Sequence, residues 1–472
     1  MPTGDLSPFR AVNLISDPIH GYIELTKRLS VAEASAANLR PEDAAEEDLL
    51  DTAWLQRLRR ISQLQSARWV FPTAEHSRFT HGLGVMHEAG LWARHLYSSL
   101  RATLEAAGET APSEGLAVET LRIAGLLHDV GHGPFAHFFD EHVLEGYPAP
   151  PDARRAPGKR LTHEDLSQLI IEHELGDLIR SLRRAPGTGG THASFADGEF
   201  IDPRWVSFLV SKPALVDPDM PRWVRLLQPL LSGVFTVDNL DYVRRDAYLT
   251  GVAIGPVDAE RLRRYTFMGP RGLTLYEPGV GALEMFLTAR LFMYQQVYFH
   301  RTVRAIDLDL AEVFGASVRA IFGTASPAES LSRYADLDEY ALLHQAALWS
   351  RNEALAEDPV PGDGRVTPAV AEGWRAILLR RPRWRAEAEI RVEYDDPRAP
   401  IPELGSLGDA IPGQVALDLA VVDARPIDPA AEPALAIEPR TGGEPISLDR
   451  ALARLPRYAM IARRFRRITP AR

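Results

Sequence analysis

The spacing of apolar residues along the first 350 positions is mainly helical. Between Leu50 and Leu64 the apolar residues recur three or four positions apart with arginines between them, which predicts a helix with one basic face. The same spacing predicts further helices over residues 80–100, 117–130, 237–248 and 282–314. Nearer the N-terminus, alternating apolar residues around Pro18 and Gly21 predict a small hairpin of two strands.

The pattern changes after about residue 350. Two segments, Ala388–Tyr394 and Val415–Val422, alternate or run apolar as strands do, and a helix is predicted over Val366–Arg380. The basic segment Arg450–Arg467 is also expected to be helical. These patterns predict a mainly α protein, in which residues 1–350 form a helical core and residues 351–472 form a smaller α+β region.

Composition excludes several classes of protein. The net charge of −11 argues against a general nucleic-acid binder, because release of counterions favours a basic surface. The chain has no cysteine, so it has neither disulfides nor thiolate-ligated zinc, and a reducing cytoplasm is the expected location. It contains no run of about 18 apolar residues, and Met1–Arg10 lacks the apolar stretch of a secretory leader. We therefore expect a cytoplasmic protein that does not span a membrane.

Histidine and aspartate are concentrated in one part of the chain. Nine of the 14 histidines fall between residues 76 and 163, and the stretch Leu126–Asp140 alone contains three histidines and two aspartates. This stretch begins at the end of the apolar run Leu121–Leu127, which is expected to be buried. Buried imidazoles and carboxylates need partners, and a divalent cation is the usual partner for such a cluster. The sequence therefore predicts a metal site.

Side chains from three predicted helices could form this site. His81 stands near the start of one helix, His128 and Asp129 stand at the end of another, and an aspartate would come from the helix over residues 237–248. Two imidazoles with two carboxylates suit a divalent ion such as Fe, Mn, Ni, Zn, Mg or Co and leave open positions for water.

Two further histidines, His132 and His137, follow the candidate ligands closely. They could protonate a leaving group or bind phosphate oxygens, so the combination favours hydrolysis of a phosphate ester. The alternative for His81, His128 and Asp129 is that they only cap helix ends and satisfy one another in the core, and the alternative for His137 and His163 is that they are surface histidines without a phosphate contact.

The order His81, His128-Asp129, Asp238 resembles the His…His-Asp…Asp pattern of the HD-domain metal-dependent phosphohydrolases. Wider agreement makes the resemblance more specific, and it extends from about residue 10 to residue 310. The matching segments are Asp17–Gly21, Gln56–Arg59, Phe71-Pro72, Ser77–Val85, His128–Phe135, and Asp241-Tyr242 with Arg245-Asp246. They resemble the branch that contains the deoxynucleoside triphosphate triphosphohydrolases, including the vertebrate antiviral enzyme with SAM and HD domains and its bacterial relatives.

This resemblance implies a role for each matching residue. The metal ligands would be His81, His128, Asp129 and Asp238. The catalytic group would be His137 as acid on the leaving group, Asp140 to orient it, Arg78 on the α-phosphate, and His132 in the phosphate site. In that family a water activated by the metal attacks the α-phosphorus and releases a deoxynucleoside and tripolyphosphate.

The resemblance also implies a substrate site. Gln63 and Leu64 would contact the deoxyribose closely enough to exclude a 2′-hydroxyl. The other expected substrate contacts are Arg78, His163, Tyr242, Asp246, which would recognise the 3′-hydroxyl, and His300.

Two positions depart from the pattern that binds triphosphate. Asn239 stands where the family carries a basic residue directly after the last metal aspartate, and Gln296 stands where a second arginine is expected. The loss of two cations should weaken the binding of a triphosphate. Two alternatives therefore stay open: an HD-domain phosphohydrolase that acts on another nucleotide or a phosphomonoester, and a nucleotide-sensing regulatory protein.

A second nucleotide site is implied as well. Asp51, Gln56 and Arg59 match positions that bind a guanine nucleotide activator at a subunit interface in the regulated members. The resemblance thus implies activation by GTP or dGTP in a homo-oligomer, a dimer or a tetramer. The insertion Ser30–Asp48 lies close by in sequence and could reshape or close this site.

Overall fold

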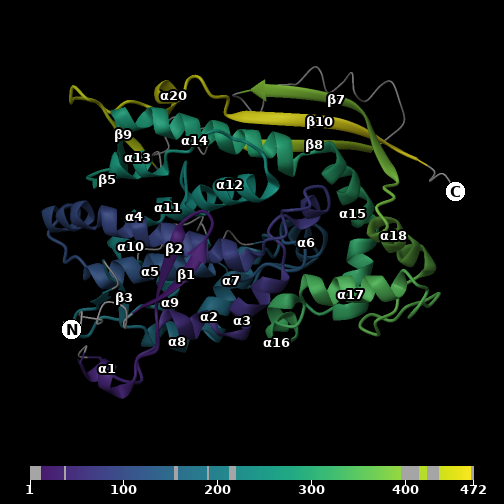
Figure 1. Cartoon of the computed structure of the whole chain (residues 1–472), viewed down its shortest axis with the longest axis horizontal. Coiled ribbons are helices and arrows are strands. Elements are labelled where there is room, and N and C mark those ends of the chain that lie inside the picture. The colour runs from purple at the N-terminus through teal and green to yellow at the C-terminus, as the bar shows by residue number, and fades with distance from the viewer. Residues whose placement is uncertain are drawn as a thin grey trace, which may run out of the picture.

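The computed structural model describes residues 12–36, 39–151, 153, 158–188, 191–211, 219–394, 414–421 and 435–468. Met1–Arg10 lies outside these residues. Helices dominate, as the sequence predicts, and the sheets are small (Figure 1). The predicted hairpin is present as β1 (Val12–Asp17) and β2 (Gly21–Thr26), which pair antiparallel. Asp17 stabilises the turn, because its Oδ1 accepts hydrogen bonds from the backbone N–H groups of Ile19 and His20.

Three helices form the centre of the core. α4 (Arg78–Ala106) packs along α5 (Glu114–Leu127), and α12 (Val237–Thr250) packs against α4. The close approach of α12 depends on Gly84, because a Cβ at this position would lie 2.0 Å from Oδ1 of Asp241. The candidate metal ligands lie on or next to these three helices, so this packing determines the distances between them.

The prediction of one continuous helix over residues 50–64 is wrong. The chain forms α2 (Glu46–Leu50), α3 (Ala53–Arg57) and the single helical turn η2 (Leu58–Arg60), and it is extended at Ile61. The break occurs because Thr52 starts a new helix, with its hydroxyl accepting from the N–H of Leu55 at 3.4 Å. Beyond the break, the N–H of Gln63 donates to the carbonyl oxygen of His76 at 3.0 Å, which brings Gln63 next to the start of α4.

The long helix expected over residues 282–314 is also interrupted. α14 (Val280–Met293) ends in a π-helical turn, η7 (Tyr294–Tyr298), and α15 (Arg301–Phe322) begins after His300. His300 is the N-cap of α15, and its Nδ1 accepts from the N–H of Thr302 at 3.2 Å. The two helices therefore run in different directions (Figure 1).

The remaining elements up to residue 276 are short and surround the central helices. They are α1 (Val31–Ala36), η3 (Gln65–Trp69), α6 (His137–His142), η4 (Leu144–Gly146), α7 (His163–Leu169), η5 (Ile170–Glu174), α8 (Gly176–Ser181), β3 (Arg184–Pro186), β4 (His192–Ser194), α9 (Pro203–Val210), α10 (Arg222–Leu227), α11 (Pro229–Ser232), α13 (Ala259–Arg264), β5 (Thr266–Gly269) and β6 (Gly272–Tyr276). Those that follow are η6 (Glu277–Gly279), η8 (Pro327–Glu329), α16 (Leu331–Tyr334), α17 (Glu339–Trp349), α18 (Pro368–Leu378), β9 (Ala436–Glu438) and α20 (Leu448–Ala451). β9 joins the β5–β6 hairpin as a third strand, so the C-terminal part also contacts the helical core.

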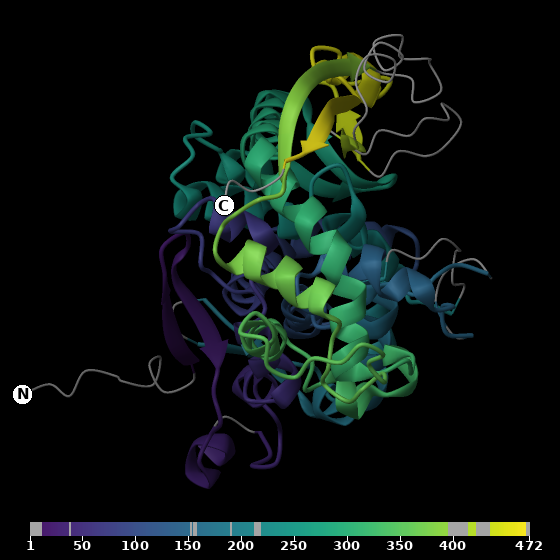
Figure 2. The ribbon, with the colours of Figure 1, turned by 90° about the vertical axis from the view of Figure 1, so that its right-hand side faces the viewer.

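The C-terminal part is α+β, as predicted. β7 (Trp384–Tyr394), β10 (Tyr458–Arg467) and β8 (Gln414–Val421) form an antiparallel sheet with β10 in the middle, at the upper right in Figure 1 and at the top in Figure 2. The helix expected over Arg450–Arg467 is wrong, because this segment contains only the end of α20 before it enters β10. The basic residues of this segment suggested an exposed helix face. Arg463 is instead buried in β10, where its Nε pairs with Oε2 of Glu389 at 2.7 Å.

The domain boundary near residue 350 stays a prediction. α18 lies beyond it and packs against α15 and α17, which lie before it. One hydrophobic cluster runs from the hairpin through the central helices to α18.

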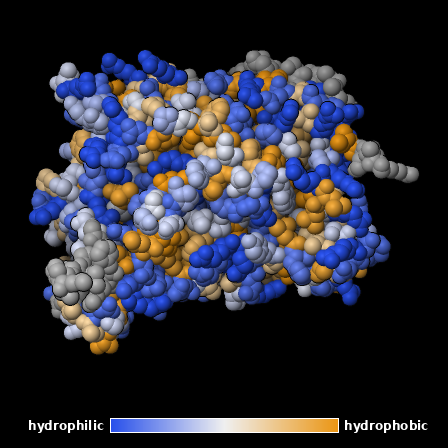
Figure 3. Space-filling model, viewed as in Figure 1, coloured by the Kyte–Doolittle hydropathy of each residue, from blue (hydrophilic) through white to orange (hydrophobic). Residues whose placement is uncertain are grey.

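In the part of the chain that the structure describes, no helix is both long enough and apolar enough to cross a membrane. On the face shown in Figure 3, hydrophilic and hydrophobic residues are mixed in small patches. The large apolar side chains gather inside, where Trp92, Trp349 and Trp374 are fully buried.

Candidate active site

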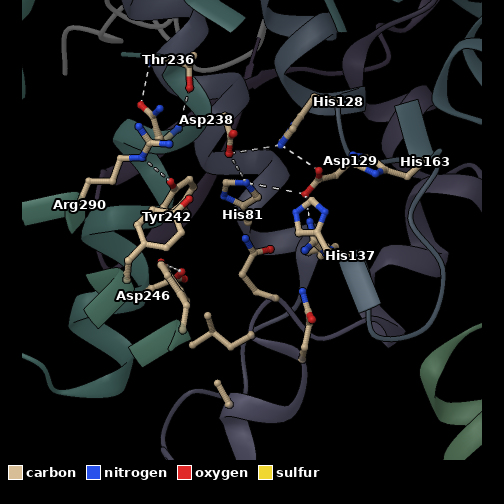
Figure 4. Close-up of a pocket in the computed structure, with 18 of the residues that line it drawn as sticks. His81, His128, Asp129, His137, His163, Thr236, Asp238, Tyr242, Asp246 and Arg290 are labelled. Atoms are coloured by element: carbon tan, nitrogen blue, oxygen red, sulfur yellow. Dashed lines mark hydrogen bonds and ion pairs between the residues drawn. The ribbon is translucent and has the colours of Figure 1, made fainter. Parts of the chain in front are cut away.

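Three side chains from the central helices converge on one point (Figure 4). Nε2 of His81 lies 3.1 Å from Oδ1 of Asp238, and Nε2 of His128 lies 3.7 Å from the same oxygen. His81 and Asp238 stand in the first turns of α4 and α12, and His128 is the C-cap of α5. The ligand-type atoms of all three lie within 4.8 Å of one another, so one ion could contact them all.

The second ring nitrogen of each histidine fixes the direction of the first. Nδ1 of His81 lies 2.8 Å from Oδ2 of Asp241, and Nδ1 of His128 lies 2.8 Å from the carbonyl oxygen of Gly125. Both acceptors favour a proton on Nδ1, so Nε2 is the nitrogen of each ring that faces the shared point and would bind a metal in exchange for any proton it carries. This is how protein histidines are usually held for a metal.

Asp241 is fully buried and is itself anchored from two sides. Arg245 donates to it from Nε at 2.8 Å and from Nη2 at 2.9 Å, and Nε2 of His20 lies 2.6 Å from its Oδ1. Arg245 also donates to Asp17 at 2.7 Å. The segment Asp17–Gly21 of the hairpin therefore supports the convergence point from behind.

Asp129, the fourth predicted ligand, borders the same point. Its Oδ1 lies 3.3 Å from Nε2 of His128, and its Oδ2 lies 3.9 Å from Nε2 of His81. Asp129 also accepts a hydrogen bond from Arg78, and Nε2 of His132 lies 3.3 Å from its Oδ1. It therefore links the candidate ligands to the two residues expected at the phosphate.

Charge at this point suits a cation. Burial lowers the pKa of His81, but the carboxylates of Asp238 and Asp241 outweigh burial and raise this pKa to about 10. Burial raises the pKa of Asp238, but hydrogen bonds from His128 and His81 hold it below its usual range. Ionised carboxylates beside imidazoles form a donor set that divalent metals accept, so the residues present fit such an ion.

A second group of titratable residues lies beside the first and consists of His132, His137, Asp140 and His163. Asp140 Oδ2 hydrogen-bonds to Nδ1 of His163 and lies 3.6 Å from Nδ1 of His137. Burial lowers the pKa of His163, but Asp140 outweighs it and raises this pKa to about 9. The ring of His132 is fully buried and stacks on His163 at 3.7 Å between centroids. His137 is the open member of the group, with 65% of its side chain exposed.

One cavity of about 600 Å³ joins both groups. The predicted residues on its wall are Gln63, Leu64, Arg78, His81, His128, Asp129, His137, His163, Asp238, Tyr242 and Asp246. His132 and Asp140 are not among the wall residues and contact the cavity through their neighbours His137 and His163. Asp246 is held rigidly, since it accepts from the hydroxyl of Tyr298 at 2.7 Å and lies 2.8 Å from Nε2 of His76.

Among the described residues, the wall carries two arginines besides Arg78, and only Arg290 was not indicated by the sequence, since Arg304 was a candidate to compensate for the missing cations. Arg290 of α14 lines the cavity and donates from Nε to the hydroxyl of Tyr242 at 3.0 Å (Figure 4). Arg304 of α15 lines it as well, and its Nε lies 2.8 Å from Oδ1 of Asp418 on β8. Gln296, which occupies the position where the family pattern has an arginine, does not line the cavity. The available signal was the four-residue spacing of Arg290 and Tyr294, which puts both on one helical face.

Asn239 lines the cavity, but its side chain serves the helix. Its Oδ1 accepts from the N–H of Thr236 at 2.7 Å, and the Thr236 hydroxyl accepts from the N–H of Asn239 at 3.1 Å. This capping box starts α12 one residue before Asp238. A basic side chain could not accept the first of these bonds, which gives a local reason for a neutral residue here.

Two sets of predicted residues lie apart from the cavity wall. His300 caps α15 and is not a wall residue, so its contact with substrate stays a prediction. Asp51 is exposed and pairs with Arg28 at 2.9 Å, while Gln56 accepts from Nε of Arg59 at 2.8 Å. Gln56 also donates to the carbonyl oxygen of Leu50, which precedes Asp51, and the role of the three proposed activator contacts stays a prediction.

Comparison with known proteins agrees with this geometry. The HD domain family model matches residues 78–192, and a model described as an HD associated region matches residues 257–355. The uncharacterized protein YwfO of Bacillus subtilis is 28% identical over 371 residues, which are 75% of this chain and 69% of that protein. The deoxynucleoside triphosphate triphosphohydrolase SAMHD1 of Danio rerio is 26% identical over 380 residues, 73% of this chain and 53% of that protein. The chain thus spans only about half the length of this enzyme.

Solved structures share the fold along almost the whole chain. A hypothetical protein from Aquifex aeolicus has a TM-score of 0.62 at 23% identity, with 96% of both chains covered. A phosphohydrolase from Bacteroides thetaiotaomicron has a TM-score of 0.60 at 20% identity, with 96% of this chain and 99% of that chain covered. The shared fold therefore includes the C-terminal region as well as the helical core.

Proposed function

Since this chain is an HD-domain phosphohydrolase of the branch that includes the SAMHD1-type enzymes, we propose that it hydrolyses deoxynucleoside triphosphates to a deoxynucleoside and tripolyphosphate in the cytoplasm. One observation carries this proposal: a single cavity is lined by the candidate metal ligands, by Arg78 and Arg290, and by His137. A nucleotide in this cavity would meet a cation site, phosphate-binding arginines and a proton donor together.

The arginines support a triphosphate as the substrate. Arg78 donates to Asp129, so its guanidinium lies beside the metal ligands, where the α-phosphate would be. Arg290 adds a second positive charge from the wall that carries Tyr242. This second charge offsets the deficit expected from Asn239, because charge-assisted contacts dominate phosphate binding.

His81, His128, Asp129 and Asp238 would hold a divalent ion, which when bound supplies a Lewis acid and lowers the pKa of water. The proton for the leaving group would come from the chain itself, at His137. Asp140 lies 3.6 Å from Nδ1 of His137 and would orient its ring toward the leaving group. His163 holds this carboxylate in place through its own hydrogen bond.

Deoxyribose would lie between two rigid parts of the wall. Gln63 is fixed by its backbone bond to His76, and Leu64 is 5% exposed. Asp246 is fixed by Tyr298 and His76. Under the proposal, Asp246 recognises the 3′-hydroxyl and Leu64 packs where a 2′-hydroxyl would need space and a partner.

Regulation by GTP or dGTP in a homo-oligomer is a further part of the proposal. Asp51, Gln56 and Arg59 would contact the guanine nucleotide. Arg28 pairs with Asp51 and also with Asp48 at the end of the insertion, so an activator would have to displace Arg28.

Product analysis tests the proposal. The protein is incubated with Mn²⁺, Mg²⁺ or Co²⁺ and with each deoxynucleoside triphosphate, deoxynucleoside monophosphate and GTP, singly and in mixtures, and the products are separated by ion-pair chromatography. Deoxynucleoside plus tripolyphosphate is expected, and a requirement for a second nucleotide would support the activator site. Orthophosphate from monophosphates would instead support the phosphomonoester alternative, and tight binding without turnover would support a sensor.

A further inference from the structure

Glu339 is a fully buried carboxylate outside the cavity wall. It is the first residue of α17 and belongs to the segment matched as an HD associated region. Its side chain is 0% exposed, and among the described residues α17 contributes nothing to the wall of the cavity. A buried carboxylate is costly unless its partners are good, so its contacts are informative.

These contacts join two segments that are far apart in the sequence. Oε2 of Glu339 accepts hydrogen bonds from the N–H of Ser62 at 3.3 Å and from the N–H of Phe135 at 3.3 Å. Oε1 lies 3.1 Å from Nη2 of Arg68. Glu339 therefore contacts both ends of the Ser62–Arg68 segment and the start of the Phe135–His137 turn.

Each of these segments carries part of the proposed substrate site. The Ser62–Arg68 segment contains Gln63 and Leu64, the proposed contacts to deoxyribose, and the Phe135–His137 turn ends in the proposed proton donor. One carboxylate thus connects the wall that would hold the sugar to the turn that presents the acid.

The Phe135–His137 turn needs such a support. Phe135 and Ala136 have φ angles of +61° and +48°, a region that costs energy for residues other than glycine. Strained residues of this kind persist where surrounding contacts fix them. The ring of Phe135 packs against those of Trp69 and Phe314, with centroids 5.6 Å and 5.7 Å apart, and its backbone N–H donates to Oε2 of Glu339.

The position of Glu339 is fixed as well. Arg57 donates to the carbonyl oxygen of Leu337 at 2.7 Å and to that of His132 at 2.7 Å. The hydroxyl of Tyr334 donates to the carbonyl oxygen of Gly131 at 2.8 Å. The chain just before α17 is therefore attached to the loop that precedes the turn, so Glu339 cannot move independently of it.

We propose that Glu339 is a positioning residue that sets the spacing between the Ser62–Arg68 segment and the Phe135–His137 turn, and so places His137 against the leaving oxygen. The roles given to Gln63 and His137 rest on the proposed function. The effect should be large on turnover, because a displacement of about 1 Å between reacting groups can cost roughly 100-fold in rate.

The test compares Glu339→Ala and Glu339→Gln with the matched control Asp338→Ala. Asp338 is the preceding residue and is also buried; it caps α17 through the N–H of Ala341 at 2.9 Å and pairs with Arg60, and within the described part of the chain no hydrogen bond or ion pair links it to either segment. With Mn²⁺ and a deoxynucleoside triphosphate, we expect Glu339→Ala to lower kcat at least about 20-fold, with KM and bound Mn²⁺ within about twofold. Asp338→Ala should lower the melting temperature and leave kcat within about twofold. Glu339→Gln keeps an oxygen that can accept both N–H groups, so it should recover part of the lost kcat.

Hydrogen exchange provides a readout that does not depend on the substrate. The amides of Ser62 and Phe135 should exchange faster in Glu339→Ala but not in Asp338→Ala. The proposal would be overturned if the amides of Ser62 and Phe135 exchanged at the same rate in both variants. It would also be overturned if kcat fell in both variants in proportion to the loss of melting temperature. If Glu339→Ala does not fold, Glu339→Leu, which removes both acceptor oxygens but fills the space, decides, and wild-type kcat with wild-type exchange in that variant overturns the proposal. A wild-type protein without turnover would refute the proposed function, while the exchange comparison would still test the link between the segments.

Discussion

Replacing Asp241 by Asn should weaken metal binding although Asp241 is not a candidate ligand. Its Oδ2 lies 2.8 Å from Nδ1 of His81 and keeps the proton on that nitrogen, so that Nε2 is free for the metal. Loss of such a partner lowers metal affinity about 10- to 100-fold, which corresponds to about 1.4–2.7 kcal/mol. The variant should also be less stable, because Arg245 is 1% exposed and loses one of two carboxylate partners. Breaking a buried pair costs roughly 3–5 kcal/mol, and the remaining bond to Asp17 at 2.7 Å favours the lower end.

The assay separates these two effects with a matched control. Mn²⁺ affinity is measured by competition with a chelating dye, and the free energy of unfolding is measured in urea. Asp17→Asn removes the other partner of Arg245 without touching His81, and its remaining oxygen can still accept from the N–H groups of Ile19 and His20. We expect Asp17→Asn to lower stability and to leave the Kd for Mn²⁺ within about twofold, whereas Asp241→Asn raises it at least about tenfold.

Either of two results would refute this reasoning. An unchanged Kd in Asp241→Asn would show that the carboxylate does not orient His81. Equal losses of affinity in both variants would attribute the effect to weakened folding around Arg245 instead of to the direction of the imidazole ring.

Three further predictions concern the cavity. His137→Ala should lower kcat by about 10²- to 10⁴-fold while nucleotide binding, measured by equilibrium dialysis, stays near the wild-type value; near-normal turnover would exclude His137 as the acid. Arg290→Gln should raise KM by about tenfold or more for a triphosphate and by less for a monophosphate, and an equal rise for both would remove Arg290 from the triphosphate site. His163 has a folded pKa of about 9, above its ordinary 6.5, so the stability from its pair with Asp140 is fully present below pH 6.5 and is lost as the pH rises through 9. Urea unfolding of wild type and His163→Gln should therefore differ by at most about 3 kcal/mol at low pH, with a difference that shrinks toward pH 9; a constant difference would contradict the pairing.

Local signals made the helical core predictable and placed His81 and His128 at helix ends, whereas the choice of Asp238 among the aspartates of its helix came from the resemblance to a known family. Each of these residues lies at a helix end, where turn and capping residues mark the boundary in the sequence itself. Thr236 is an example, because its capping box with Asn239 is a short-range pattern that fixes where α12 begins. The order of the metal-type residues then followed from the resemblance to a known family.

Features that depend on contacts between distant segments could not be predicted. The role of Arg290 becomes visible only when α14 packs beside Tyr242, and that of Glu339 only when α17 meets Ser62 and Phe135. β10 was mistaken for a helix because its arginines look like a solvated face, whereas Arg463 is buried by an acidic partner on β7. The sequence records the charges but not the pairing that allows them to be buried.

The order of the strands in the C-terminal sheet has a consequence for the newly made chain. β10 lies between β7 and β8 but follows both of them in the sequence, so neither neighbour can pair until β10 has left the ribosome. Asp418 on β8 holds Arg304, which lines the cavity. The predicted core, residues 1–350, is made first and is expected to fold during synthesis, as N-terminal domains usually do, but this wall of the cavity is completed last. A nascent chain would therefore acquire its metal-site geometry before its full substrate site.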